Sequence, residues 1–150
     1  MPFTNFKYYF KWILFSVLIG VITAIGKGLI YSRLDLRGEN YASIILFVEC
    51  FVIQLSNAAV MEEPLFRGFM WGCLEKSGWR QAWILLFQAT IFCIGHVYYL
   101  PHDPIFFIGT FIDALVFGFL VWKSKSIGTS MIAHGLINSL VDLIVHYKWN

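Results

Sequence analysis

The chain has 150 residues, of which 59% are hydrophobic and 13% are charged, with a mean hydropathy of +0.70 and a net charge of +2. A soluble domain of this length cannot bury that much apolar surface. The composition therefore excludes a soluble globular protein and indicates a polytopic membrane protein. The small net charge does not favour a nucleic-acid-binding surface. By length, residues 1–150 form a single domain.

Five apolar segments alternate with polar loops, at about residues 12–25, 41–74, 82–99, 105–122 and 127–147. Because ~20 apolar residues cross a bilayer as one helix, we predict an all-α polytopic transmembrane helical bundle of about five spans. Residues 1–39 would form an N-terminal span and loop. The second segment is too long for one span. We expect it to be strongly tilted or to break between Asn57 and Pro64, since proline disturbs the preceding turn or starts a new helix.

The basic residues of the loops predict the orientation. Five crossings place the N-terminus on the same side as the loops at 75–80 and 123–126. That side holds Lys7, Lys11, Lys76, Arg80, Lys123 and Lys125, against Lys27, Arg33, Arg37 and Lys148 on the other. The small excess favours a cytoplasmic N-terminus by the positive-inside rule. We expect a multi-pass protein of the bacterial inner membrane.

The second apolar segment contains three charged residues, Glu62, Glu63 and Arg67. An ionised side chain at mid-bilayer costs at least ~3 kcal/mol on insertion scales, so three of them need a reason. One interpretation is a structural ion pair that joins two helices, and the other is a reaction site. Glu63 and Arg67 are spaced i, i+4 and can pair on one helix face. Glu62 points ~100° away from Glu63, which leaves it as the carboxylate for chemistry.

Two further motif pairs at i, i+4 spacing place polar residues in apolar segments, Phe92 with His96 and His134 with Asn138. At ~1.5 Å per helical residue, Glu62 lies ~20 Å and His96 ~21 Å from the nearest loop of the N-terminal side. Asn138 lies ~18 Å and His134 ~12 Å from that side. Taken singly, each histidine would be a packing residue. Their similar depth on segments of alternating direction predicts one shared intramembrane site.

These residue types can hydrolyse an amide bond. Burial beside a histidine makes Glu62 suitable as a general base, and His96 can orient the water that Glu62 activates. His134 and Asn138 can donate hydrogen bonds to an oxyanion. Alternatively, Glu62, His96 and His134 make a catalytic zinc set with an open position. No HExxH motif imposes zinc, so the residue types leave both mechanisms open.

Three motifs in this order resemble those of the CAAX-protease and bacteriocin-processing (CPBP, or Abi) family of intramembrane proteases, over about residues 40–147. The stretch Glu62–Arg67 matches its EExxxR motif, Phe92–His96 its FxxxH motif and His134–Asn138 its HxxxN motif. The resemblance implies a CAAX-protease-like core within a single membrane-embedded protease domain.

The resemblance also implies roles for individual residues. By it, Glu62 and His96 activate the water, His134 and Asn138 form the oxyanion hole, and Glu63, Arg67 and Phe92 support the site. Members of the family are described both as metalloproteases and as metal-independent glutamic proteases. We favour the glutamic type without a cofactor, with zinc as the alternative.

The expected partners are a membrane-associated protein or peptide substrate and the lipid bilayer, with no nucleic acid. The substrate class stays open between prenylated CAAX proteins, sorting signals and bacteriocin-related peptides. Two other functions compete with hydrolysis. One is a non-catalytic membrane immunity or scaffold protein. The other is a proton- or ion-coupled transporter, against which the chain has no internal repeat or paired broken helices.

Overall fold

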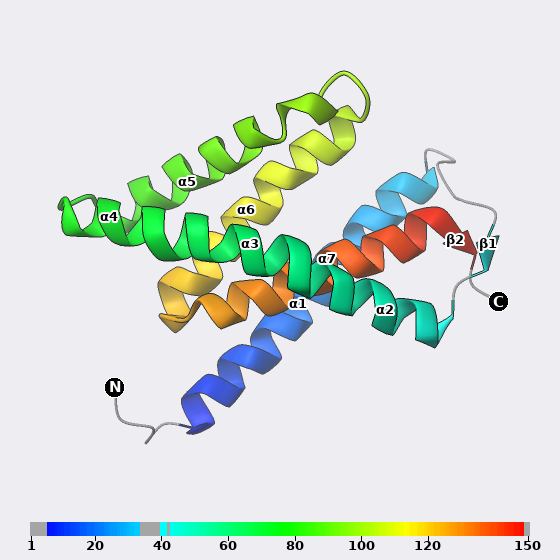
Figure 1. Cartoon of the computed structure of the whole chain (residues 1–150), viewed down its shortest axis with the longest axis horizontal. Coiled ribbons are helices and arrows are strands. Elements are labelled where there is room, and N and C mark those ends of the chain that lie inside the picture. Colours follow the sequence, from blue (N-terminus) through cyan, green and yellow to red (C-terminus); the bar gives the residue numbers. More distant parts are fainter. Residues whose placement is uncertain (1–5, 34–39, 42, 149–150) are drawn as a thin grey trace. The chain divides into compact units, whose positions relative to one another are not determined.

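The computed structural model describes residues 6–33, 40–41 and 43–148. Nearly all of these residues are helical, which confirms the all-α prediction (Figure 1). The elements in chain order are α1 (Phe6–Arg33), β1 (Asn40–Tyr41), α2 (Ile44–Gln54), η1 (Leu55–Ala59), α3 (Val60–Glu63), η2 (Pro64–Met70), α4 (Trp71–Lys76), α5 (Gln81–Gly95), η3 (Val97–Tyr99), α6 (Pro104–Ser124), α7 (Ile127–His146) and β2 (Tyr147–Lys148).

The five predicted apolar segments all appear as helices. Within the described residues, four runs are long and apolar enough to cross a membrane: Phe6–Tyr31, Ile44–Lys76, Pro104–Ser124 and Ile127–Ile144. The fifth, α5, has 15 residues and so a length of ~22 Å, which is less than the ~30 Å of a bilayer core. The first helix extends beyond the predicted 12–25 at both ends. The predicted loop after it falls partly in that helix and partly outside the described residues.

Two alternatives were expected for the second apolar segment, a strong tilt or a break between Asn57 and Pro64, and the helix does not break there. Helical backbone runs from Ile44 to Lys76, and its irregularity takes the form of two π-helical segments, η1 and η2. These flank α3, which carries Glu62 and Glu63. Pro64 is the first residue of η2 but lies inside this continuous run, so its missing N–H removes one backbone hydrogen bond of the helix. Such π-helical turns occur frequently at functional sites.

The chain divides into two compact units, with the divisions inside α3 and inside α7. The first unit comprises residues Met1–Val60 and Met131–Asn150, and the second comprises Met61–Ser130. The single membrane-embedded domain therefore stays a prediction.

In the first unit, small residues bring α1 close to α7. A Cβ atom at Gly20 would lie 3.3 Å from the Cβ atom of Leu136, and one at Gly28 would lie 2.5 Å from Cγ2 of Ile144. Small residues at such contacts let helix backbones approach closely in a membrane. On another side of α7, the Cys50 thiol of α2 donates a weak hydrogen bond to Asp142 over 3.7 Å. The backbones of β1 and β2 pair in parallel beside the end of α7.

In the second unit, α5 and α6 form an antiparallel hairpin that is visible in Figure 1. The Asp103 side chain begins α6 by accepting a hydrogen bond from the Phe106 amide over 2.8 Å, and Pro104 follows at the first helical position. The core at this interface consists of Ala89, Phe92 and Ala114, with Phe66, Phe111 and Leu115 packed around them. This core carries the candidate site.

Close contact between α5 and α6 depends on Gly118. An added Cβ atom there would lie 2.5 Å from both Nε2 of Gln88 and Cδ1 of Leu85. We expect Gly118→Ala to lower the free energy of unfolding by about 1–3 kcal/mol, because the added Cβ atom must displace the ends of the Gln88 and Leu85 side chains that pack between the helices. The matched control is Gly72→Ala in α4, where an added Cβ atom meets nothing within 4 Å. Equal unfolding midpoints for the two variants in detergent would contradict this packing.

Candidate active site

The second unit buries an ion pair. Nη1 of Arg67 lies 3.1 Å from Oε1 of Glu63, and both side chains are fully buried. This confirms the pairing predicted from the i, i+4 spacing. Arg67 is on η2 and Glu63 ends α3, so the pair joins the π-helical segment to the turn before it. Both charged groups are removed from water, so the energetic cost of burying each one is offset only by the opposite charge and by its hydrogen bonds.

Aromatic rings enclose the guanidinium of Arg67. Its central carbon lies 4.4 Å from the ring centroid of Phe92, 5.3 Å from that of Phe117 and 5.7 Å from that of Phe66. Phe66 and Phe92 meet edge to face at 5.0 Å. The negative faces of such rings stabilise a desolvated cation. Phe92, predicted as a supporting residue from its motif, therefore contacts the charged stretch directly.

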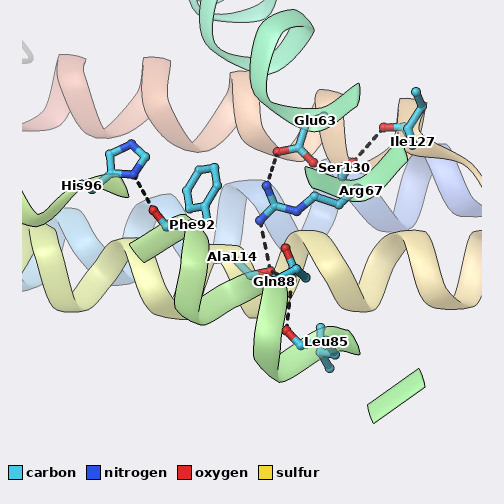
Figure 2. Close-up of polar contacts among 9 residues, drawn as sticks. All are labelled: Glu63, Arg67, Leu85, Gln88, Phe92, His96, Ala114, Ile127 and Ser130. Atoms are coloured by element: carbon cyan, nitrogen blue, oxygen red, sulfur yellow. Dashed lines mark hydrogen bonds and ion pairs between the residues drawn. The ribbon is translucent and has the colours of Figure 1, made fainter. Parts of the chain in front are cut away.

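A backbone carbonyl completes the environment of Arg67. Nη2 of Arg67 donates to the Ala114 carbonyl of α6 over 3.3 Å, and Nε2 of Gln88 donates to the same oxygen over 3.0 Å. Gln88 also donates to the Leu85 carbonyl over 3.1 Å. Figure 2 shows Arg67 lying between Glu63 and these groups. Side chains of η2 and α5 thus both bind one carbonyl oxygen of α6, which connects the three segments.

His96 lies at the end of α5 and not within a helix. The predicted segment to residue 99 is wrong here, because α5 ends at Gly95. Nδ1 of His96 lies 2.8 Å from the Phe92 carbonyl (Figure 2). The backbone N–H of His96 donates to the Cys93 carbonyl instead. The side chain thus takes the acceptor that a further helical turn would use, which ends the helix.

This hydrogen bond fixes the tautomer of His96. A carbonyl oxygen can only accept, so Nδ1 carries the proton and Nε2 of the neutral ring carries the lone pair. The ring packs on Phe92 with centroids 4.7 Å apart and on Tyr99 at 6.3 Å. His96 therefore presents a basic nitrogen from a ring that is held on both sides.

Other acids lie near Arg67. Glu62 is half-buried in α3, and Asp113 is buried in α6 one residue before Ala114. Both lie within electrostatic reach of Arg67, as does Glu63. The second unit therefore gathers Glu62, Glu63 and Asp113 around one guanidinium.

His134 and Asn138 belong to the first unit. His134 is buried, and Asn138 is half-buried with its Nδ2 donating to Oε1 of Gln54 over 3.2 Å. Gly135 lies between them and lets Phe51 and Leu55, on the helical run that carries Gln54, approach α7 closely. An added Cβ atom at Gly135 would lie 3.2 Å from Phe51 and 3.5 Å from Leu55. The first unit thus positions Asn138, while the shared site of all four predicted catalytic residues remains a prediction.

The predicted zinc set has Glu62 and His96 in the second unit and His134 in the first. In the parts of the chain that the structure describes, no three His, Cys, Asp or Glu side chains are grouped so as to hold a metal ion. One feature of the donors does suit a metal. A ligating histidine usually donates its other ring N–H to a carbonyl or a carboxylate, as His96 does.

Sequence reasoning missed two amides of this region, Gln54 and Gln88. Each is a neutral polar residue inside an apolar segment. Burying an amide without a hydrogen bond is costly, so such residues point to a partner even where no motif includes them. Their partners, Asn138 and the Ala114 carbonyl, are 84 and 26 residues away in the chain.

Comparison with protein families matches residues 43–140 to the family described as type II CAAX prenyl endopeptidase Rce1-like. No curated protein and no solved structure matches the chain. The matched stretch begins at Ser43, whose side chain caps α2, and ends within α7, so it includes every predicted site residue. This confirms the resemblance drawn from the three motifs. The chain is thus an integral membrane protein that belongs to the Rce1-like family of CAAX-type intramembrane endopeptidases.

Proposed function

We propose that the chain hydrolyses a peptide bond of a membrane-associated protein or peptide with a water molecule activated by Glu62 and His96. The observation that carries this proposal is the position of Phe92. Its ring lies on Arg67 and its carbonyl holds Nδ1 of His96, so one residue links the EExxxR stretch to the catalytic histidine. A purely structural ion pair would not require the histidine to be oriented in this way.

In this mechanism Nε2 of His96 accepts a hydrogen bond from the attacking water. Glu62 removes a proton from that water, and the oxygen forms a bond to the carbonyl carbon of the substrate. Glu62, now protonated, gives the proton to the leaving nitrogen as the C–N bond breaks. Glu63 and Arg67 hold the helix that carries Glu62. The products are a carboxylic acid and an amine, which exchange a proton to become a carboxylate and an ammonium group.

His134 and Asn138 would donate hydrogen bonds to the oxyanion of the tetrahedral intermediate. The amide nitrogen of Asn138 carries two N–H groups, and Gln54 accepts from one of them. Gln54 would thereby orient the carboxamide of Asn138 so that its other N–H can donate a hydrogen bond to the oxyanion. We assign Gln54 as a positioning residue for Asn138.

The zinc-dependent form of the same hydrolysis is the second candidate, because the Nδ1–H contact of His96 also suits a metal ligand. Glu62, His96 and His134 would hold the ion. A bound zinc would supply Lewis acidity and lower the pKa of water.

We expect Asn138→Ala to lower kcat by about 10²–10³-fold, the usual effect of losing one oxyanion donor. Gln54→Leu should lower kcat by roughly 10–100-fold with little change in KM, because a misplaced donor acts mainly in the transition state. The control is Ser56→Ala, two residues further along, whose hydroxyl bonds the Ile53 carbonyl. If Gln54→Leu and Ser56→Ala have equal kcat values, Gln54 does not position the donor.

The proposal is tested with purified protein in liposomes, incubated with a quenched farnesylated CAAX-type peptide, its unfarnesylated form and a library of membrane-inserted peptides. Mass spectrometry identifies the products. We expect endoproteolytic cleavage at one bond of at least one probe, and cleavage of the farnesylated form alone would identify the substrate class. If the wild type cleaves none of the three, the non-catalytic immunity or scaffold role is favoured.

We propose the bacterial inner membrane as the location, with a cytoplasmic N-terminus.

A further inference from the structure

A pocket with a volume of about 340 Å³ lies at the turn between α4 and α5, lined by Trp79, Arg80 and Trp83. It is remote from the residues of the proposed reaction, since Glu62 lies ~20 Å away along its helix. The two indole side chains are 43% and 60% exposed. The pocket therefore offers two apolar walls and one cation at the surface of the second unit.

The backbone of this turn has one defined conformation. Gly78 has a φ of 82°, and the Trp79 amide donates to the Leu74 carbonyl over 3.1 Å, which closes the end of α4. The Trp79 ring then meets Phe87 of α5 edge to face at 5.4 Å. The pocket is thus held by both helices and does not depend on a ligand to form.

The charge of Arg80 is available at this pocket. Among the described residues, its guanidinium makes no ion pair or hydrogen bond. The neighbouring carboxylate of Glu75 instead accepts a hydrogen bond from Gln81, and the amide oxygen of Gln81 accepts from Trp71 over 3.2 Å. The nearby acid is therefore engaged by another side chain.

The same end of the second unit carries further cations. Because α5 and α6 are antiparallel, the end of α6 lies beside the start of α5 (Figure 1). Lys123 and Lys125 lie there, and Lys76 ends α4. Lys123 also lies over the Trp122 ring, 4.2 Å from its centroid. Cations and indoles at the ends of apolar helices are typical of the level of the lipid headgroups.

We propose that the Trp79–Arg80–Trp83 pocket binds the headgroup of an anionic phospholipid. The guanidinium fork of Arg80 would contact phosphate oxygens in a bidentate manner. The two indoles would pack against the glycerol and the first acyl carbons. Arg80 would favour a lipid with net negative charge over a zwitterionic one, because the choline ammonium of a zwitterionic lipid already neutralises its phosphate. Lys76, Lys123 and Lys125 would add a general attraction between this surface and anionic lipids.

The test is native mass spectrometry of the purified full-length chain in detergent, titrated separately with dioleoyl phosphatidylglycerol and dioleoyl phosphatidylcholine. We expect the wild type to bind phosphatidylglycerol about tenfold more tightly, the size of one charge-assisted contact. Arg80→Gln should abolish this preference, and Arg80→Lys should leave an intermediate one. Trp83→Ala should weaken the binding of both lipids and keep their ratio.

The matched control is Lys76→Gln, which removes the same charge four residues before Arg80 but does not line the pocket. It should keep most of the preference for phosphatidylglycerol. If Lys76→Gln and Arg80→Gln lose the preference for phosphatidylglycerol equally, the preference comes from general surface charge, and the pocket is not a specific lipid site. A wild type that binds both lipids equally would also overturn the proposal. Because Arg80 is exposed, its variants should unfold at the temperature of the wild type.

Discussion

Glu62→Gln should lower kcat/KM for any membrane peptide that the wild type cleaves by about 10²–10⁴-fold, the contribution of a positioned general base. Glutamine keeps the size of the side chain but cannot accept the proton of water. The effect should be on kcat, with KM nearly unchanged, because the carboxylate acts on water and does not bind the substrate. Initial rates in liposomes over a range of peptide concentrations give both constants.

The matched control is Glu49→Gln. Glu49 is also an acid in an apolar segment, and it is exposed on α2. We expect this variant to cleave at the rate of the wild type. If Glu62→Gln cleaves as fast as Glu49→Gln while both are folded, Glu62 is not the base. The charged stretch would then be structural.

Arg67→Met should lower the free energy of unfolding by about 3–5 kcal/mol, because it leaves the Glu63 carboxylate buried without its cation. Methionine fills a similar volume among the rings of Phe66, Phe92 and Phe117, so lost packing contributes little. Denaturant unfolding in detergent measures the difference, with the helix signal in circular dichroism as the readout.

The double variant Glu63→Gln with Arg67→Met distinguishes the ion pair from packing. Replacing both partners of a buried pair often costs little, so the double variant should be more stable than Arg67→Met alone. Additive losses from the two single variants would show that the pair, despite its 3.1 Å contact, carries no coupling energy.

The helical architecture could be predicted because each apolar segment is long and bounded by polar residues. The ion pair between Glu63 and Arg67 followed from local spacing alone, and the contact confirms it. The Rce1-like family was predictable for a similar reason, since the three motifs are local patterns in a fixed order. Local information of this kind is fully present in the chain.

Other features depend on contacts that the local pattern does not specify. The FxxxH spacing lets the His96 ring reach the Phe92 carbonyl, but it does not show that this contact ends α5 at Gly95. The rings around Arg67 come from three helical segments, and Phe117 is 50 residues further along the chain than Arg67. The sequence indicated η1 and η2 only as a possible break, because the pattern of side chains gives no sign of a change in backbone hydrogen-bond register. The roles of Glu62, His96, His134 and Asn138 stay predictions for mutagenesis.

The most direct measurement is peptide cleavage by one detergent-purified preparation whose metal content is determined alongside, with and without a chelator. We expect cleavage without stoichiometric metal, unchanged by the chelator and lost in Glu62→Gln. Stoichiometric zinc with cleavage that the chelator abolishes and zinc restores would contradict the glutamic mechanism. Glu62, His96 and His134 would then be metal ligands, and Nε2 of His96 would bind the ion in place of water.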